Sequence, residues 1–157
     1  MITERDYWRL RSAEHGLDTV GLMRLYFEPS GDHLIRSEMA AIVGEVQAVG
    51  QKAGLLTNDL SAFHAPSWRH RITVLSKVSP LVDLSVIGYL KPDPRGYGAA
   101  IEAMNVEASE IVFVDDQPAN VAGARAAGMT AVWFDATDVA GSIASFRSAL
   151  VDESPQE

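Results

Sequence analysis

The sequence predicts an α/β fold in which a mainly parallel sheet is covered by helices on both faces. From Ala53 onward, short apolar runs of strand length alternate with segments whose apolar residues recur at helical spacing. Strands with such uninterrupted apolar runs are typical of parallel sheets, because helices bury both faces of these sheets. The predicted strands are residues 54–56, 82–87, 111–114 and 131–134.

Helix starts and ends lie between these runs. A helix is expected after Pro94, and Pro118 stands where a first-turn proline is tolerated in the next one, which should end at Gly128. Asp138 can cap a last helix whose apolar stripe includes Phe146. Strand and helix therefore alternate to the end of this part of the chain.

Before Ala53 the pattern is helical. Thr3 and Asp18 can each cap a helix, a turn is expected at residues 29–32, and Gly50 stands near the end of a third helix. This third helix follows Ser37, and its predicted stripe is Met39, Ile42, Val43, Val46 and Val49.

Composition narrows the classes of function. A chain of 157 residues suits one domain, and its net charge of −8 argues against binding nucleic acid, whose phosphates need Lys and Arg. No apolar stretch approaches the roughly 20 residues of a membrane span. Because the sequence has no cysteine and starts without an apolar signal core, we expect a cytoplasmic protein.

Polar side chains follow three of the four predicted strands. Thr57 and Asn58 come after the first, Lys91 after the second, and Asp115 and Asp116 after the third. Ligands bind beyond the carboxyl ends of parallel strands, so these groups are expected to converge. Each alone is also explained as a helix cap or a solvated loop residue. Together they suit a phosphate, held by hydroxyl, amide and ammonium donors, beside carboxylates that hold Mg²⁺.

Residues 54–59, 91–94 and 112–121 resemble the second, third and fourth motifs of the haloacid dehalogenase superfamily, in its branch with a helical cap. Their order and approximate spacing agree with that family. The resemblance implies a Rossmann-like α/β core over residues 36–150 and a helical cap remnant over residues 1–35. Residues 151–157 are expected to be a frayed tail.

The resemblance also implies roles for the strand-end residues. Thr57 would bind the phosphoryl group, and Asn58 would help to position the substrate. Lys91 would stabilise the nucleophile and the transferring phosphate. Asp115 would bind Mg²⁺, with Asp116 as a ligand or as its supporting partner. Thr57, Lys91 and Asp116 are thus the expected catalytic residues, and a small phosphorylated metabolite is the expected substrate.

The sequence departs from the family at the first motif, in which an aspartate after an apolar strand attacks phosphorus. Asp6, Asp18 and Asp32 do not follow such a strand, and Asp59 falls within the second motif. We therefore expect that the first strand is missing and that the chain alone has little or no activity.

Three explanations of the missing strand stay open. The family places it between the strands that end at Thr57 and Asp115, so its omission exposes two inner edges. The chain could be a truncated or wrongly started enzyme; a partner chain or a second copy could complete the sheet; or the four strands could close directly. A non-catalytic regulatory or binding module is the alternative function. A receiver domain does not fit, because its acidic pair precedes its Thr and Lys.

Overall fold

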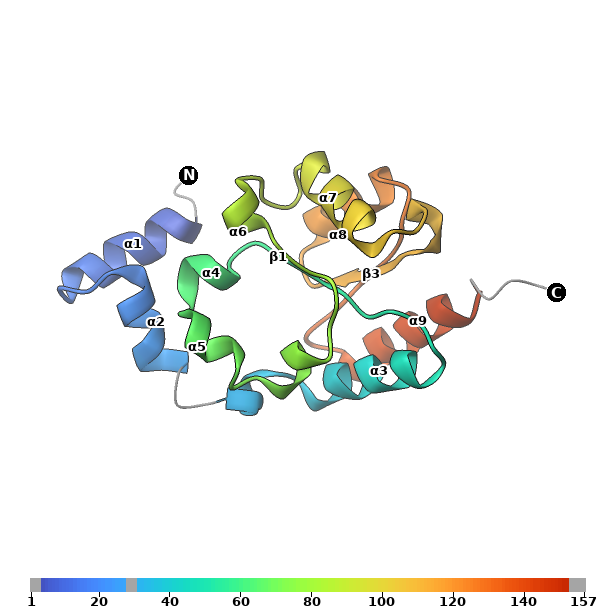
Figure 1. Ribbon diagram of the computed structural model, residues 1–157, viewed down its shortest axis with the longest axis horizontal. Coiled ribbons are helices and arrows are strands. Elements are labelled where there is room, and N and C mark those ends of the chain that lie inside the picture. The colour runs from blue at the N-terminus through green and yellow to red at the C-terminus, as the bar shows by residue number, and fades with distance from the viewer. Residues whose placement is uncertain (1–3, 28–30, 153–157) are drawn as a thin grey trace. The chain divides into compact units, whose positions relative to one another are not determined.

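The computed structural model describes residues 4–27 and 31–152. It divides into two compact units, Met1–Ile87 and Gly88–Glu157, and each is described by itself (Figure 1). The domain boundary predicted near residue 35 stays a prediction.

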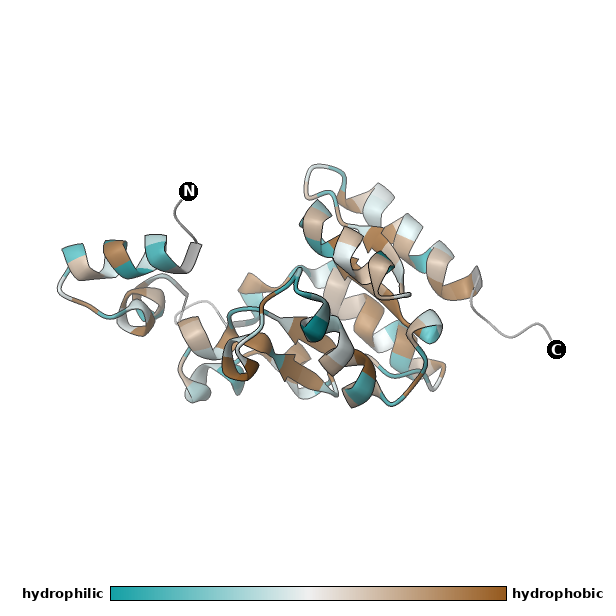
Figure 2. Cartoon of the chain, turned by 90° about the horizontal axis from the view of Figure 1, so that it is seen from above, coloured by the Kyte–Doolittle hydropathy of each residue, from teal (hydrophilic) through white to brown (hydrophobic). Residues whose placement is uncertain are grey.

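The first unit begins with a helical pair, α1 (Glu4–Glu14) and α2 (Thr19–Phe27), whose helices contact each other. The predicted cap of α2 is confirmed, since the Asp18 carboxylate accepts a 2.6 Å hydrogen bond from the Gly21 N–H. Thr3, the predicted cap of α1, lies outside the described residues. Figure 2 shows α1 as mostly hydrophilic with a hydrophobic band, and its apolar side chains Tyr7 and Leu10 are 43% and 51% exposed.

The third helix, α3 (Ser37–Ala48), follows a short 3₁₀ helix, η1 (Gly31–Leu34). Ile42 and Val46 of its predicted stripe are buried. The last predicted stripe residue was wrong: Val49 is 73% exposed, because the helix ends at Ala48. Part of the turn predicted at residues 29–32 lies outside the described residues, and the rest belongs to η1.

Two short parallel strands form the sheet of the first unit. The strand β1 (Leu55–Thr57) pairs in register with β2 (Leu81–Asp83). Between them lie α4 (Leu60–Phe63), α5 (Pro66–Arg69) and η2 (Thr73–Ser76). The strand predicted at residues 82–87 was too long, because the chain turns into helix α6 (Leu84–Ile87) directly after Asp83.

A small core holds this unit together. Leu60, Trp68 and Ile72 are buried and pack as one cluster with Ile35, Val74, Leu75 and Leu81 around it. Because the cluster draws on α4, α5, η2 and β2, burial of its apolar surface fixes these short segments, which would be unstable as isolated helices.

Within the described residues, the second unit contains the second strand pair and three α-helices of 9 to 14 residues. The elements are α7 (Pro94–Met104), η3 (Ala108–Glu110), β3 (Val112–Asp115), α8 (Pro118–Ala126), β4 (Thr130–Trp133) and α9 (Val139–Asp152). The helices of this unit begin where the sequence predicts. Asp138, for example, caps α9 by accepting a 3.0 Å hydrogen bond from the Gly141 N–H. The helix α9 extends to Asp152, and residues 153–157 lie outside the described part.

The strands β3 and β4 pair in parallel and are contacted by both α8 and α9. Figure 1 shows α7 and α8 on one side of β3 and α9 on the other. The centre of this unit is Tyr97, which is fully buried, donates a 2.8 Å hydrogen bond to the Asn120 carbonyl and meets Phe113 edge to face. The predicted parallel α/β class with covering helices is thus confirmed.

The four strands form two separate parallel pairs. In the described part of the chain, β1 is hydrogen-bonded to β2 alone and β3 to β4 alone. Direct closure of all four strands into one sheet, one of the three alternatives, stays a prediction. Within residues 4–27 and 31–152, every helix is too short or too polar to span a bilayer.

Candidate functional site

Lys91 and Asp115 form a buried ion pair in the second unit. The Lys91 Nζ lies 2.7 Å from Asp115 Oδ2, and the two side chains are only 10% and 7% exposed. The ammonium also lies over the ring of Phe113, 5.6 Å from its centroid. Few waters reach this pair, so each charge depends on the other for its stability. Two residues 24 positions apart are thereby brought together, as the sequence predicts.

The other oxygen of Asp115 is held by the segment that follows β3. The Gln117 N–H donates to Asp115 Oδ1 at 2.9 Å, and the Asn120 Nδ2 donates at 3.0 Å. Pro118 starts α8 where a missing N–H costs nothing. With three donors on one carboxylate, the orientation of Asp115 at the strand end is fixed.

Asp116 differs from its neighbour because it is exposed. Its backbone carbonyl accepts a 2.9 Å hydrogen bond from Trp133 Nε1, and Trp133 is the register partner of Asp115 on β4. The backbone at this strand end is therefore anchored, and the Asp116 carboxylate is accessible to solvent beside the buried carboxylate of Asp115.

This pair of carboxylates fits one way in which proteins hold Mg²⁺. That cation is commonly bound through one or two carboxylates, and water and substrate phosphate supply the other ligands. Among the described residues, no three Asp, Glu, His or Cys side chains cluster closely enough to form an all-protein site. The accessible Asp116 can meet a hydrated cation directly, whereas Asp115 would share its charge with Lys91.

Thr57 and Asn58 stand at the carboxyl end of β1 in the first unit. Both are half-buried, and Thr57 Oγ1 accepts a 3.3 Å hydrogen bond from the Asp59 N–H. Asp59 is the residue before α4. The hydroxyl of Thr57 keeps its proton for a further acceptor, and an anion such as phosphate can use it.

Asp83, the last residue of β2, organises the same strand end. It pairs in register with Thr57, and its carboxylate accepts bonds from the Ser61 N–H (2.7 Å) and from the Ser85 hydroxyl (2.6 Å). The Arg69 guanidinium lies 3.5 Å away. Burial raises the pKa of Asp83, but the hydrogen bonds from Ser61 and Ser85 outweigh this effect and leave the pKa lowered. Asp83 is therefore a charged anchor for α4 and α6.

A signal for Asp83 exists in the sequence. An aspartate at the end of an apolar run, with a serine two residues later, is typical of a side chain that hydrogen-bonds to the backbone ahead of it and starts a helix. The signal was overlooked because residues 84, 86 and 87 are apolar as well, so strand and helix form one mostly apolar run.

Tyr97 and Asn120 were also missed as supports of the acidic pair. Tyr97 OH bonds the backbone of Asn120, whose side chain in turn bonds Asp115. Burial, together with the Asp115 charge, raises the pKa of Tyr97 to about 12. Asn120 is 2% exposed, and its Oδ1 is buried without a hydrogen-bond partner in the described part of the chain.

Comparison with known proteins gives the context for this geometry. The model of the haloacid dehalogenase-like hydrolase family matches residues 3–128. The chain belongs to the haloacid dehalogenase-like hydrolases. A phosphatase of Mycobacterium tuberculosis is 37% identical over 91 residues, which are 58% of this chain and 42% of that protein. The phosphoserine phosphatase of Thermus thermophilus is 31% identical over 119 residues, 73% of this chain and 46% of that protein.

A third relative of this haloacid dehalogenase-like chain is the phosphoglycolate phosphatase of Rhodospirillum rubrum. It is 32% identical over 95 residues, 59% of this chain and 38% of that protein. The chain therefore spans less than half the length of each of these three relatives.

Two solved structures share the fold of this haloacid dehalogenase-like chain. A haloacid dehalogenase phosphatase from Thermococcus onnurineus has a TM-score of 0.54 and 25% identity over 64% of this chain and 46% of its own. An uncharacterised protein from Corynebacterium glutamicum has a TM-score of 0.59 and 22% identity over 71% of this chain and 80% of its own, a likeness of fold alone.

The structure thus assembles part of the predicted site of a haloacid dehalogenase-like hydrolase. Lys91, Asp115 and Asp116 lie at one strand end of the second unit, while Thr57 and Asn58 lie at a strand end of the first. The roles of these five residues stay predictions.

Proposed function

We propose that these residues form the scaffold of a Mg²⁺-dependent hydrolase that acts on a small phosphate ester. The observation that carries the proposal is the buried ion pair of Lys91 and Asp115 beside the accessible carboxylate of Asp116. Buried charges are costly unless they are paired, and in clefts they are commonly functional. Membership of a hydrolase family and three phosphatase relatives support the same chemistry.

Each proposed role follows from the chemistry of the residue. Thr57 donates its hydroxyl hydrogen to a phosphoryl oxygen, and the backbone N–H groups around Asn58 add further donors. Lys91 neutralises charge on the transferring phosphate through its ammonium. Asp115 holds that ammonium in place through the ion pair, and so prepares it before the substrate arrives.

Asp115 and Asp116 are the residues that would hold Mg²⁺. When bound, the cation supplies charge stabilisation to the phosphate oxygens. Asp116 is exposed, so its carboxylate can replace a water molecule of the hydrated cation. Asp115 is fixed by Gln117 and Asn120, so its contribution is orientation as well as charge.

The nucleophile is the missing part of this proposal. Asp83 does end an apolar strand, but hydrogen bonds from Ser61 and Ser85 engage both of its carboxylate oxygens and it is only 7% exposed. A carboxylate held in this way is a poor nucleophile. We therefore propose that this chain alone turns over little or no substrate.

A further strand would supply the nucleophile. In the described residues β1 and β3 each have one strand neighbour, and their residues are only half-buried although they are mostly apolar. Open edges of this kind accept an added strand. We propose that this strand comes from a segment outside these residues, in the same polypeptide, a partner chain or a second copy. We also propose that the protein is located in the cytoplasm.

The direct test is hydrolysis of 4-nitrophenyl phosphate in the presence of Mg²⁺ by chain of verified mass, beside Asp116→Asn. The expected result is turnover no faster than in buffer for both proteins, with an established phosphatase as the positive control. Turnover that needs Mg²⁺ and is lost in Asp116→Asn would contradict the proposed absence of a nucleophile, and Asp59 would be the next residue to change.

A non-catalytic binding or regulatory module is the second candidate. It is favoured by one observation: both oxygens of Asp115 are already engaged, one by Lys91 and the other by Gln117 and Asn120. A cation would have to compete with these donors. If phosphate binds the chain equally well with and without Mg²⁺, this second candidate is preferred.

A further inference from the structure

One peptide group in the second unit links Trp133 to the buried carboxylate of Asp115. This group lies between Asp116 and Gln117. Its carbonyl accepts a 2.9 Å hydrogen bond from Trp133 Nε1, and its N–H donates a 2.9 Å hydrogen bond to Asp115 Oδ1. Because a trans peptide is planar, its carbonyl and its N–H point in opposite directions and cannot turn independently. The indole, the peptide and the carboxylate therefore form one hydrogen-bonded chain.

The register of β3 and β4 brings Trp133 to this peptide. Trp133 is paired with Asp115, and the next residue, Phe134, donates its N–H to the Asp115 carbonyl at 2.9 Å. The end of β4 thus donates to two consecutive carbonyls, those of Asp115 and Asp116. The neighbouring strand therefore holds the backbone from which both carboxylates extend.

Burial of the indole does not explain the position of Trp133. Its side chain is 48% exposed, whereas Ala131 and Phe134 on either side are 7% and 8% exposed. Aromatic residues are common in strands because they pack on partly buried surfaces. Here nearly half of the side chain stays in water, so much of that contribution is lost. What Trp133 supplies at this strand end is its indole N–H, a donor that purely apolar side chains lack.

We propose that Trp133 is a positioning residue for the Mg²⁺ site at Asp115 and Asp116. The proposal rests on the proposed function, since it assumes that these two carboxylates hold the cation. The Trp133 bond fixes the Asp116 carbonyl and, through the shared peptide, the N–H that orients Asp115. Mg²⁺ demands nearly ideal octahedral geometry, so it tolerates little displacement of its ligands. Without the indole N–H this peptide can rotate, and the two carboxylates are then less well placed for the cation.

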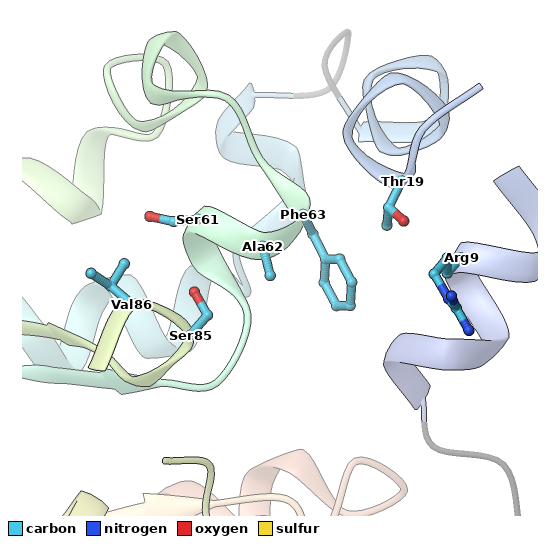
Figure 3. A pocket seen from close by; sticks show the side chains of 7 residues that line it. All are labelled: Arg9, Thr19, Ser61, Ala62, Phe63, Ser85 and Val86. Carbon is cyan, nitrogen blue, oxygen red and sulfur yellow. The ribbon is translucent and has the colours of Figure 1, made fainter. Parts of the chain in front are cut away.

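The test is an NMR titration of the chain with MgCl₂, followed through the amide resonance of Gln117. This amide donates to Asp115, so its chemical shift responds to a cation at the acidic pair without any turnover. In Trp133→Phe, which keeps a ring but has no donor, the titration midpoint should rise about tenfold. The hollow of the first unit in Figure 3 gives an internal reference. None of the described residues that line it carries a carboxylate, so the amides of Ala62 and Phe63 should not shift.

Val132→Ala is the matched control for a general loosening of β4. Val132 precedes Trp133 on the same strand and is half-buried, but its side chain has no hydrogen-bonding group. Its replacement should leave the midpoint as in the wild type. If Trp133→Phe keeps the wild-type midpoint, or if Val132→Ala raises it as much, the positioning role is overturned while the Mg²⁺ site stands. If the Gln117 amide of the wild type does not respond to Mg²⁺, the proposed function is contradicted and this inference with it.

Discussion

At the scale of single residues, the arrangement around Asp115 explains why this strand end is stable although the burial of its two charges is costly. Lys91 and Asp115 are almost completely withdrawn from water, at 10% and 7% exposure. Desolvation of two charges is repaid only when the geometry is good and the remaining hydrogen-bonding groups are satisfied. Gln117 and Asn120 supply that second condition at the other carboxylate oxygen.

Removal of one member of the pair should therefore be expensive. Lys91→Met should lower the free energy of unfolding by about 3 kcal/mol, because it leaves the Asp115 charge buried without its partner. Urea denaturation of the second unit measures this. The double variant Lys91→Met with Asp115→Asn should recover much of the loss. Glu102→Gln, at an exposed position of the same unit, should change stability by less than about 0.5 kcal/mol. If Lys91→Met costs no more than Glu102→Gln, the importance of the ion pair is contradicted.

Tyr97 makes the stability of the second unit depend on alkaline pH. Its pKa is raised from 10.0 to about 12, so the folded state holds the phenol proton more tightly than the unfolded state does. The resulting stabilisation is fully present below pH 10 and is lost as the pH rises toward 12, at up to about 1.4 kcal/mol per pH unit.

The measurement is unfolding free energy against pH for the wild type and Tyr97→Phe. At neutral pH the variant should be less stable by about 1 kcal/mol, because the bond to the Asn120 carbonyl is lost. Between pH 10 and 12 the wild type should lose this advantage. Parallel curves for the wild type and Tyr97→Phe would refute the assignment.

At the scale of elements, most boundaries could be predicted because they depend on local chemistry. Pro94, Pro118 and Asp138 stand at helix starts, and three of the four predicted strands lie within one or two residues of their observed positions. The fourth prediction was wrong at α6, since an apolar strand leads directly into an apolar helix. The hydrogen bonds of Asp83 lie at this junction; two come from Ser85, and one comes from Ser61, 22 residues away.

Asp83 is therefore expected to be the most important polar residue of the first unit. Asp83→Ala should lower the free energy of unfolding by about 3 kcal/mol, since the bonds to Ser61, Ser85 and Arg69 are lost together. Hydrogen exchange at the Ser61 and Ser85 amides should become faster.

The control for this prediction is a carboxylate that caps only one helix. Asp138→Ala removes an exposed cap from α9 and should cost about 1 kcal/mol. If Asp83→Ala costs no more than Asp138→Ala, the carboxylate of Asp83 is an ordinary cap and the account of this element is wrong.

At the scale of the whole molecule, the central question is whether residues from both units serve one ligand. The motif order predicts it, and the family to which the chain belongs supports a phosphate ester as that ligand. Sequence could place Thr57, Lys91 and Asp115 at strand ends because apolar runs and polar termini are local features. It could not show which strands pair, since pairing depends on contacts between residues far apart in the chain; each unit has one parallel pair.

The most direct test of a shared site is calorimetric binding of inorganic phosphate to the chain, with and without Mg²⁺. We predict that Mg²⁺ strengthens phosphate binding, and that Thr57→Val in the first unit and Asp116→Asn in the second each weaken it about tenfold or more. Thr137→Val and Glu102→Gln, at exposed positions, serve as controls and should bind like the wild type. Phosphate binding that is indifferent to Mg²⁺ and unchanged in both site variants would contradict the account.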